Sequence, residues 1–187
     1  MTTTTPRRAT IIHGYGATPA DHWFGWLAEQ LAGDGLAPTV PTLPDPQQPD
    51  AARWQAEVAA AVGVPVAGDV VVAHSLGSLT VLRHLLALPP GWRLGTLVLV
   101  AGFAEPVPGF AALDVFVAGR TDVSPVAAHV DRVVVLRSDA DPIVPTALTD
   151  RLAAQLGVRA QVVAGAGHFL AEEGVTTLPE AAAAIVR

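Results

Sequence analysis

The chain has 187 residues, of which 51% are hydrophobic and 15% are charged, and this length is typical of a single domain. The formal net charge of −6 and the lack of any run of basic residues argue against nucleic acid or an anionic membrane surface as a partner. There is no cysteine, which excludes disulfides, thiolate metal sites and a cysteine nucleophile. The polar first residues carry no apolar stretch of signal-peptide length and no run could span a bilayer, so we expect a cytoplasmic protein.

The first part of the chain is predicted to run from a strand through a loop into a helix. A β-branched run at 9–13 predicts a strand that ends in the glycine-rich loop 14–16. The tetrapeptide Thr18-Pro19-Ala20-Asp21 predicts the start of a helix. Threonine can cap the helix N-terminus, proline suits the first turn, and the aspartate side chain can reach back to the backbone N–H of the capping residue. Apolar residues then recur every four positions, as on one buried helix face: Trp23, Leu27 and Leu31. A second strand is expected at 37–40.

The remaining chain continues the alternation of apolar strands and helices. Strands are expected at 70–73, 97–101, 133–137 and 160–163, and helices at 50–61, 79–88, 146–156 and from Pro179 onward. The stretch 103–129 is the least regular and is too short for an independent cap. Six strands alternating with helices predict a single-domain α/β fold, with a mostly parallel sheet and helices on both faces. We expect this domain to span 9–187 after a flexible segment at 1–8.

A serine stands where a strand turns into a helix, in Ala73-His74-Ser75-Leu76-Gly77. A nucleophile elbow needs this placement, because the tight turn lifts the hydroxyl out of the sheet and small flanking residues avoid clashes. The usual pattern is G-x-S-x-G, and here Ala73 takes the place of the first glycine. The helix N-terminus behind Ser75 would place free N–H groups where negative charge develops. A serine that only caps the helix is the alternative.

An aspartate and a histidine follow later strands, in the order Ser…Asp…His that such elbows require. Asp141 comes after the strand at 133–137, and His168 comes after the last strand. His168 would take the proton of Ser75, and the carboxylate of Asp141 would fix the imidazole tautomer. Asp139 is the rival acid. Asp141 could instead start a turn, and His168 could be a loop histidine without a catalytic role.

Two backbone N–H groups are expected to form an oxyanion hole. One belongs to Leu76, directly after the nucleophile, and the best candidate for the other is Tyr15 in the loop after the first strand. The glycines of this loop also match part of a dinucleotide-binding motif, but its third glycine is absent.

Aromatic residues near these positions could line a substrate pocket: Tyr15, Trp23, Phe103 and Phe169. Trp23 could instead face the core. His22, His84 and His129 lack the paired spacing of metal ligands, and His84 is expected to be exposed on its helix. We therefore expect neither a metal nor a cofactor.

Further motifs accompany the elbow along nearly the whole chain: His13-Gly14-Tyr15-Gly16, residues 22–27, Pro41-Thr42-Leu43-Pro44, Trp54, residues 138–142 and residues 167–169. Together they resemble the small serine hydrolases related to retinoblastoma-binding protein nine. This resemblance implies a six-stranded α/β-hydrolase fold of sheet order 2-1-3-4-5-6 with little or no lid, and a triad at Ser75, Asp141 and His168. The sequence departs from the family at Ala73, where glycine is more frequent.

The predicted activity is hydrolysis of a small-molecule carboxylic ester through an acyl-enzyme. The missing lid favours short acyl chains. A thioesterase or an acyltransferase could use the same residues. The alternative to an enzyme is a catalytically silent protein-binding module, although no protein partner is indicated by the sequence.

Overall fold

The computed structural model describes residues 7–185. Its strands are β1 (Arg8–Ile12), β2 (Ala37–Thr39), β3 (Val70–His74), β4 (Leu94–Val100), β5 (Val130–Ser138) and β6 (Gln161–Val163). Its α-helices are α1 (Phe24–Gly33), α2 (Ala51–Val62), α3 (Leu76–Ala87), α4 (Asp114–Val117), α5 (Thr146–Gln155) and α6 (Pro179–Ile185). Three 3-10 helices complete it: η1 (Ala111–Leu113), η2 (Ser124–His129) and η3 (Ala171–Glu173).

The six strands form one sheet in the order β2-β1-β3-β4-β5-β6, and every neighbouring pair is parallel. This confirms the predicted sheet. The strand order reverses between β1 and β3, so their carboxyl ends open a crevice where ligands bind in folds of this kind. The loops that follow β1 and β3 carry the oxyanion candidate and Ser75.

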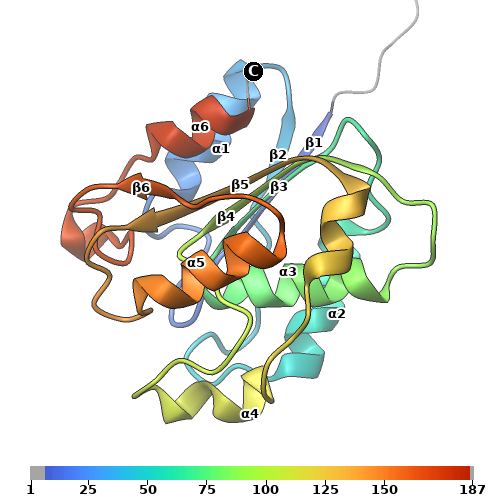
Figure 1. Cartoon of the computed structure of the whole chain (residues 1–187). Coiled ribbons are helices and arrows are strands. Elements are labelled where there is room, and N and C mark those ends of the chain that lie inside the picture. The colour runs from blue at the N-terminus through green and yellow to red at the C-terminus, as the bar shows by residue number, and fades with distance from the viewer. Residues whose placement is uncertain (1–6, 186–187) are drawn as a thin grey trace, which may run out of the picture.

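Helices cover both faces of the sheet, with α1 and α6 on one side and α2, α3 and α5 on the other (Figure 1). The sequence of strand β3 does not alternate between apolar and polar residues, because the strand is buried on both faces of the sheet. Val71 and Ala73 pack into the core under α2, α3 and α5, whereas Val70 and Val72 pack into the core under α1 and α6. Successive side chains of a strand point to opposite faces, so a strand buried on both faces is apolar throughout.

The helix α1 begins later than its start signal predicted. Asp21 does reach back to Thr18, as predicted: its carboxylate accepts hydrogen bonds from the Thr18 N–H at 2.7 Å and from the Thr18 hydroxyl at 2.8 Å. The chain then passes through His22 with a φ of 54°, which a right-handed helix cannot accommodate. The helix therefore starts at Phe24, and its predicted apolar face is buried as expected.

The described chain begins close to the predicted domain start. Arg8 already belongs to β1, and the Nε–H of Arg7 donates to the Gly68 carbonyl at 2.7 Å. The other six residues of the expected flexible segment lie outside the described residues. Within 7–185, every helix is too short or too polar to cross a lipid bilayer.

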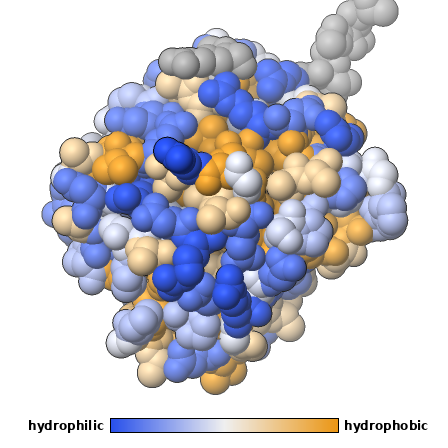
Figure 2. Space-filling model, viewed as in Figure 1, coloured by the Kyte–Doolittle hydropathy of each residue, from blue (hydrophilic) through white to orange (hydrophobic). Residues whose placement is uncertain are grey.

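Polar and apolar side chains are mixed over the face shown in Figure 2. The large apolar side chains that stand exposed belong to different elements and loops: Val64, Val66, Val115, Ile143 and Val162.

Candidate active site

Ser75 sits in the one-residue turn between β3 and α3, as the elbow motif predicts. Its backbone adopts φ 51° and ψ −124°, a combination that costs a non-glycine residue conformational energy and is common at nucleophile elbows. The Ser75 N–H donates to the Val100 carbonyl at 2.9 Å, which ties the turn to the end of β4. This strained turn places Ser75 at the carboxyl edge of the sheet, where it is largely buried and borders a cavity.

Two glycines allow the turn to pack against the loop after β1. A Cβ atom on Gly77 would lie 2.4 Å from the His13 carbonyl oxygen, and one on Gly14 would lie 2.9 Å from the Ser75 Cβ. Both distances are below 3.0 Å, which is closer than Cβ atoms approach other heavy atoms in proteins, so only glycine fits at these two positions. Ala73, the departure from the motif, places its methyl group in the core below α3.

The structure brings Ser75, His168 and Asp141 into one hydrogen-bonded line. The Ser75 hydroxyl is 2.9 Å from His168 Nε2, and His168 Nδ1 is 2.8 Å from Asp141 Oδ2. The side chains of His168 and Asp141 are 5% and 3% exposed. Because the carboxylate can only accept, Nδ1 carries the proton and Nε2 presents its lone pair to the serine.

The backbone holds the Asp141 carboxylate in place. Its other oxygen accepts the N–H groups of Ile143 and Val144, both at 2.8 Å. The rival acid Asp139 points elsewhere: it is exposed and accepts the N–H of Gly165 at 2.8 Å. Asp139 therefore lies outside the hydrogen-bonded line.

The two expected oxyanion donors have free N–H groups. Among residues 7–185, neither the Tyr15 N–H nor the Leu76 N–H has a hydrogen-bond acceptor. The loop that carries Tyr15 is held by His13, whose Nδ1–H donates to the Gly14 carbonyl at 3.0 Å and whose Nε2 accepts the Leu43 N–H at 3.1 Å. Burial lowers the pKa of His13, which keeps this imidazole neutral, as its two roles require.

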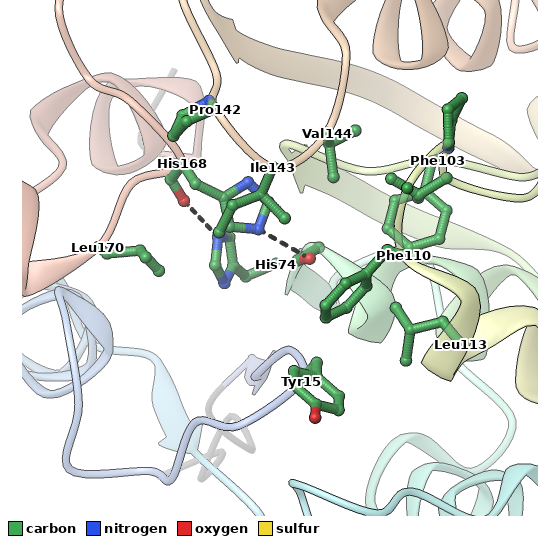
Figure 3. Close-up of a pocket in the computed structure, with 14 residues that line it drawn as sticks. Tyr15, His74, Phe103, Phe110, Leu113, Pro142, Ile143, Val144, His168 and Leu170 are labelled. Atoms are coloured by element: carbon green, nitrogen blue, oxygen red, sulfur yellow. Dashed lines mark hydrogen bonds between the residues drawn. The ribbon is translucent and has the colours of Figure 1, made fainter.

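A cavity of about 500 Å³ opens beside Ser75 and His168 (Figure 3). Tyr15 and Phe103 line it as predicted, and Phe110 packs edge-on against Tyr15 at a ring distance of 5.2 Å. Its other walls are mostly apolar: Val107, Pro108, Gly109, Leu113, Pro142, Ile143, Val144 and Leu170. The sequence reasoning missed these walls, because most lie in irregular segments without periodicity.

Two predicted pocket residues were wrong. Trp23 and Phe169 are fully buried in the core under α1 and α6, on the opposite face of the sheet from the cavity walls. Phe169 follows His168 directly, but its φ of 63° reverses the chain and turns its side chain away.

Other histidines also differ from expectation. His84 is buried rather than exposed, and its Nε2 lies 2.7 Å from the Gly63 carbonyl oxygen. His74, next to the nucleophile, lines the cavity and was not singled out as functional. Within the described residues, no group of three or more His, Asp or Glu side chains is arranged to hold a metal ion.

Comparisons with known proteins agree with this geometry. A family model described as serine hydrolase matches residues 9–187. The Bacillus subtilis (strain 168) protein named "Putative hydrolase YdeN" is 35% identical over 173 residues, which cover 92% of this chain and 91% of that protein. The crystal structure of the B. subtilis ydeN gene product matches with a TM-score of 0.90 and 34% identity, over 95% of each chain.

A more distant structure shares the fold alone. Est1E from Butyrivibrio proteoclasticus matches with a TM-score of 0.70 at 15% identity, over 97% of this chain and 89% of that chain. The match to the family model over residues 9–187 and the similarity to YdeN are consistent with the elbow and the sheet order. The chain belongs to the serine hydrolase family.

Proposed function

We propose that this protein hydrolyses carboxylic esters, with Ser75 as the nucleophile, His168 as the general base and Asp141 as the residue that orients the base. The observation that carries the proposal is the line of hydrogen bonds from Ser75 Oγ through His168 to Asp141, at 2.9 and 2.8 Å. These distances lie within the range in which a base can take the proton of a nucleophile. The line ends in an apolar cavity, which is where a substrate would bind.

The proposed reaction proceeds through an acyl-enzyme. Ser75 Oγ attacks the ester carbonyl carbon while its proton passes to His168 Nε2, and the oxyanion accepts the N–H groups of Leu76 and Tyr15. The bond from the carbonyl carbon to the alcohol oxygen then breaks, and His168 returns the proton to the departing alcohol. Water, deprotonated by His168, then attacks the carbonyl carbon of the acyl-enzyme. The bond from this carbon to Ser75 Oγ breaks, His168 returns the proton to Ser75, and the acid is released.

The walls of the cavity bear on the size of the acyl group. The segment 103–113 supplies one side of the cavity but forms no separate cap. A volume of about 500 Å³ is in the lower half of the range of roughly 300–1,000 Å³ for small-molecule sites. We propose that the site holds a short acyl group, because a long chain would extend beyond these walls.

The test is a panel of p-nitrophenyl esters from acetate to palmitate, with fluorophosphonate labelling of the same samples. We expect turnover and labelling in the wild type, a decline toward the long esters, and loss of both signals in Ser75→Ala. The loss of kcat should be at least about 10⁴-fold, as when a triad member is removed. The control is Ser124→Ala, which changes an exposed serine at the start of η2 and should leave both signals intact.

Failure of the wild type to label or to hydrolyse any ester would refute the proposal and favour the silent binding module. Thioesters and added acceptor alcohols in the same panel would distinguish a thioesterase or an acyltransferase. Two predictions from the sequence stay predictions. They are the membership in the group of hydrolases related to retinoblastoma-binding protein nine and the cytoplasmic location.

A further inference from the structure

His168 lies in a loop whose backbone is unusual on both sides. Gly167 precedes it with a φ of 54° and Phe169 follows it with a φ of 63°. The second value is unfavourable for an aromatic residue. The direction of the His168 ring therefore depends on whatever holds this loop in its conformation.

A carboxylate holds the loop from one side. Glu173 Oε2, from the end of η3, accepts the N–H of His168 at 2.6 Å and the N–H of Leu170 at 3.1 Å. The carboxyl group lies so close under the loop that a Cβ atom on Gly167 would come within 2.3 Å of it. Glycine at 167 is therefore required for the carboxylate to reach its place.

The imidazole of His74 holds the same residue from the other side. Its Nε2 lies 2.9 Å from the His168 carbonyl oxygen (Figure 3). Because a carbonyl can only accept, Nε2 carries the proton and donates. Burial keeps the pKa of His74 well below its usual value, so the ring remains neutral and Nδ1 lacks a proton.

Among the described residues, the bond from Nε2 is the only hydrogen bond that the His74 ring makes. His74 Nδ1 is buried and has no hydrogen-bond partner among the described residues. A buried, unsatisfied nitrogen is unfavourable, so an apolar side chain would be the better choice if His74 only filled space. The histidine is explained by its bond to the His168 carbonyl.

We propose that His74 and Glu173 are positioning residues, which together form a clamp on the main chain of His168. Both polar groups of the His168 backbone are held by side chains, the N–H by Glu173 and the C=O by His74. His74 is also the residue next to Ser75, so the clamp joins the nucleophile to the backbone of the base. The inference rests on the proposed function of the triad.

The Glu173 variants test the clamp from the η3 side. Glu173→Ala should lower kcat by about 10- to 100-fold with KM changed less than about threefold, since a displacement of about 1 Å costs up to about 10²-fold. Glu173→Gln keeps an oxygen that can accept and should recover most of the lost kcat. The control is Glu172→Ala, which changes the exposed neighbour and should match the wild type. Equal losses in the Ala and Gln variants, or a loss in KM alone, would overturn the proposal.

The His74 variants test it from the β3 side. His74→Gln can place an N–H near the position of Nε2 and should retain more kcat than His74→Leu, which cannot donate. If His74→Leu does not fold, as judged by circular dichroism, the Glu173 pair decides alone.

A spectroscopic readout separates this proposal from the esterase proposal. The Nδ1 proton of His168, bonded to Asp141, should give a downfield NMR signal in the wild type that weakens in Glu173→Ala and persists in Glu172→Ala. An undiminished signal in Glu173→Ala would refute the clamp even if the wild type hydrolyses no ester. An inactive wild type whose signal responds as expected would refute only the esterase.

Discussion

Two aspartates two residues apart differ completely in what their carboxylates contact. Asp141 binds His168 Nδ1 and two backbone N–H groups, whereas Asp139 binds the Gly165 N–H at the surface. We expect Asp141→Asn to lower kcat/KM for a p-nitrophenyl ester by roughly 10⁴-fold, because an amide stabilises the wrong imidazole tautomer. Steady-state kinetics on the purified variant give the value.

Asp139→Asn is the matched control, since it makes the same chemical change at the rival acid. Its kcat/KM should stay within about threefold of the wild type. If Asp139→Asn proved the more damaging of the two, the acid of the triad would have been assigned to the wrong residue.

At the scale of elements, the contact between α3 and the end of β1 depends on Gly77. A methyl group there would lie 2.4 Å from the His13 carbonyl oxygen, so Gly77→Ala must push the helix away from the strand. Overpacking of this kind costs about 1–3 kcal/mol, and displacement of the elbow should also lower the rate of the proposed ester hydrolysis. Urea unfolding gives the free energy of unfolding, and the ester assay gives the activity.

The control glycine lies in a helix with room around it. A Cβ atom on Gly25, in α1, meets nothing within 4 Å, so Gly25→Ala should raise the free energy of unfolding by up to about 1 kcal/mol. A Gly77→Ala variant as stable and as active as Gly25→Ala would show that the contact tolerates a side chain.

The elements that position the proposed triad were predictable from sequence because their signals are local. The apolar run of β3 and the turn after it are adjacent in the chain, and Asp141 and His168 each follow a strand. The start of α1 was predicted too early, because the left-handed backbone of His22 has no signature in its residue type. The clamp was missed for a different reason: the contact between His74 and the His168 backbone joins residues 94 positions apart.

At the scale of the whole molecule, the pocket depends on which face of the sheet a side chain reaches. Phe103 and Trp23 are both fully buried aromatic residues, and both were predicted to line the pocket. They nevertheless belong to hydrophobic cores on opposite faces of the sheet. Periodicity predicts that a residue is buried but not on which face. The triad could therefore be proposed from sequence, whereas two of the four aromatic residues predicted to line the pocket, Trp23 and Phe169, lie on the other face of the sheet.

Three buried or half-buried histidines should make the stability of the whole fold depend on pH. Burial lowers the pKa of His74, His13 and His22. Below the unfolded value of about 6.5 the unfolded chain binds protons that the folded chain refuses, so stability is greatest above this pH and falls as the pH decreases. The decline continues until each folded pKa is passed. Its slope is up to about 1.4 kcal/mol per pH unit for each deeply buried ring, and less for His22, which solvent screens.

Urea unfolding at several pH values between 7.5 and 4.5 measures this dependence. Carboxylates with lowered pKa values, such as Asp69 and Asp21, add their own losses only as the pH approaches about 4, so the histidines dominate the interval. His74→Gln removes one titrating ring and should make the slope shallower between pH 6.5 and 5. A free energy of unfolding that stays constant across this interval in the wild type would mean that these rings accept protons in the folded protein. In that case His74 could not be the neutral donor on which the His168 carbonyl depends.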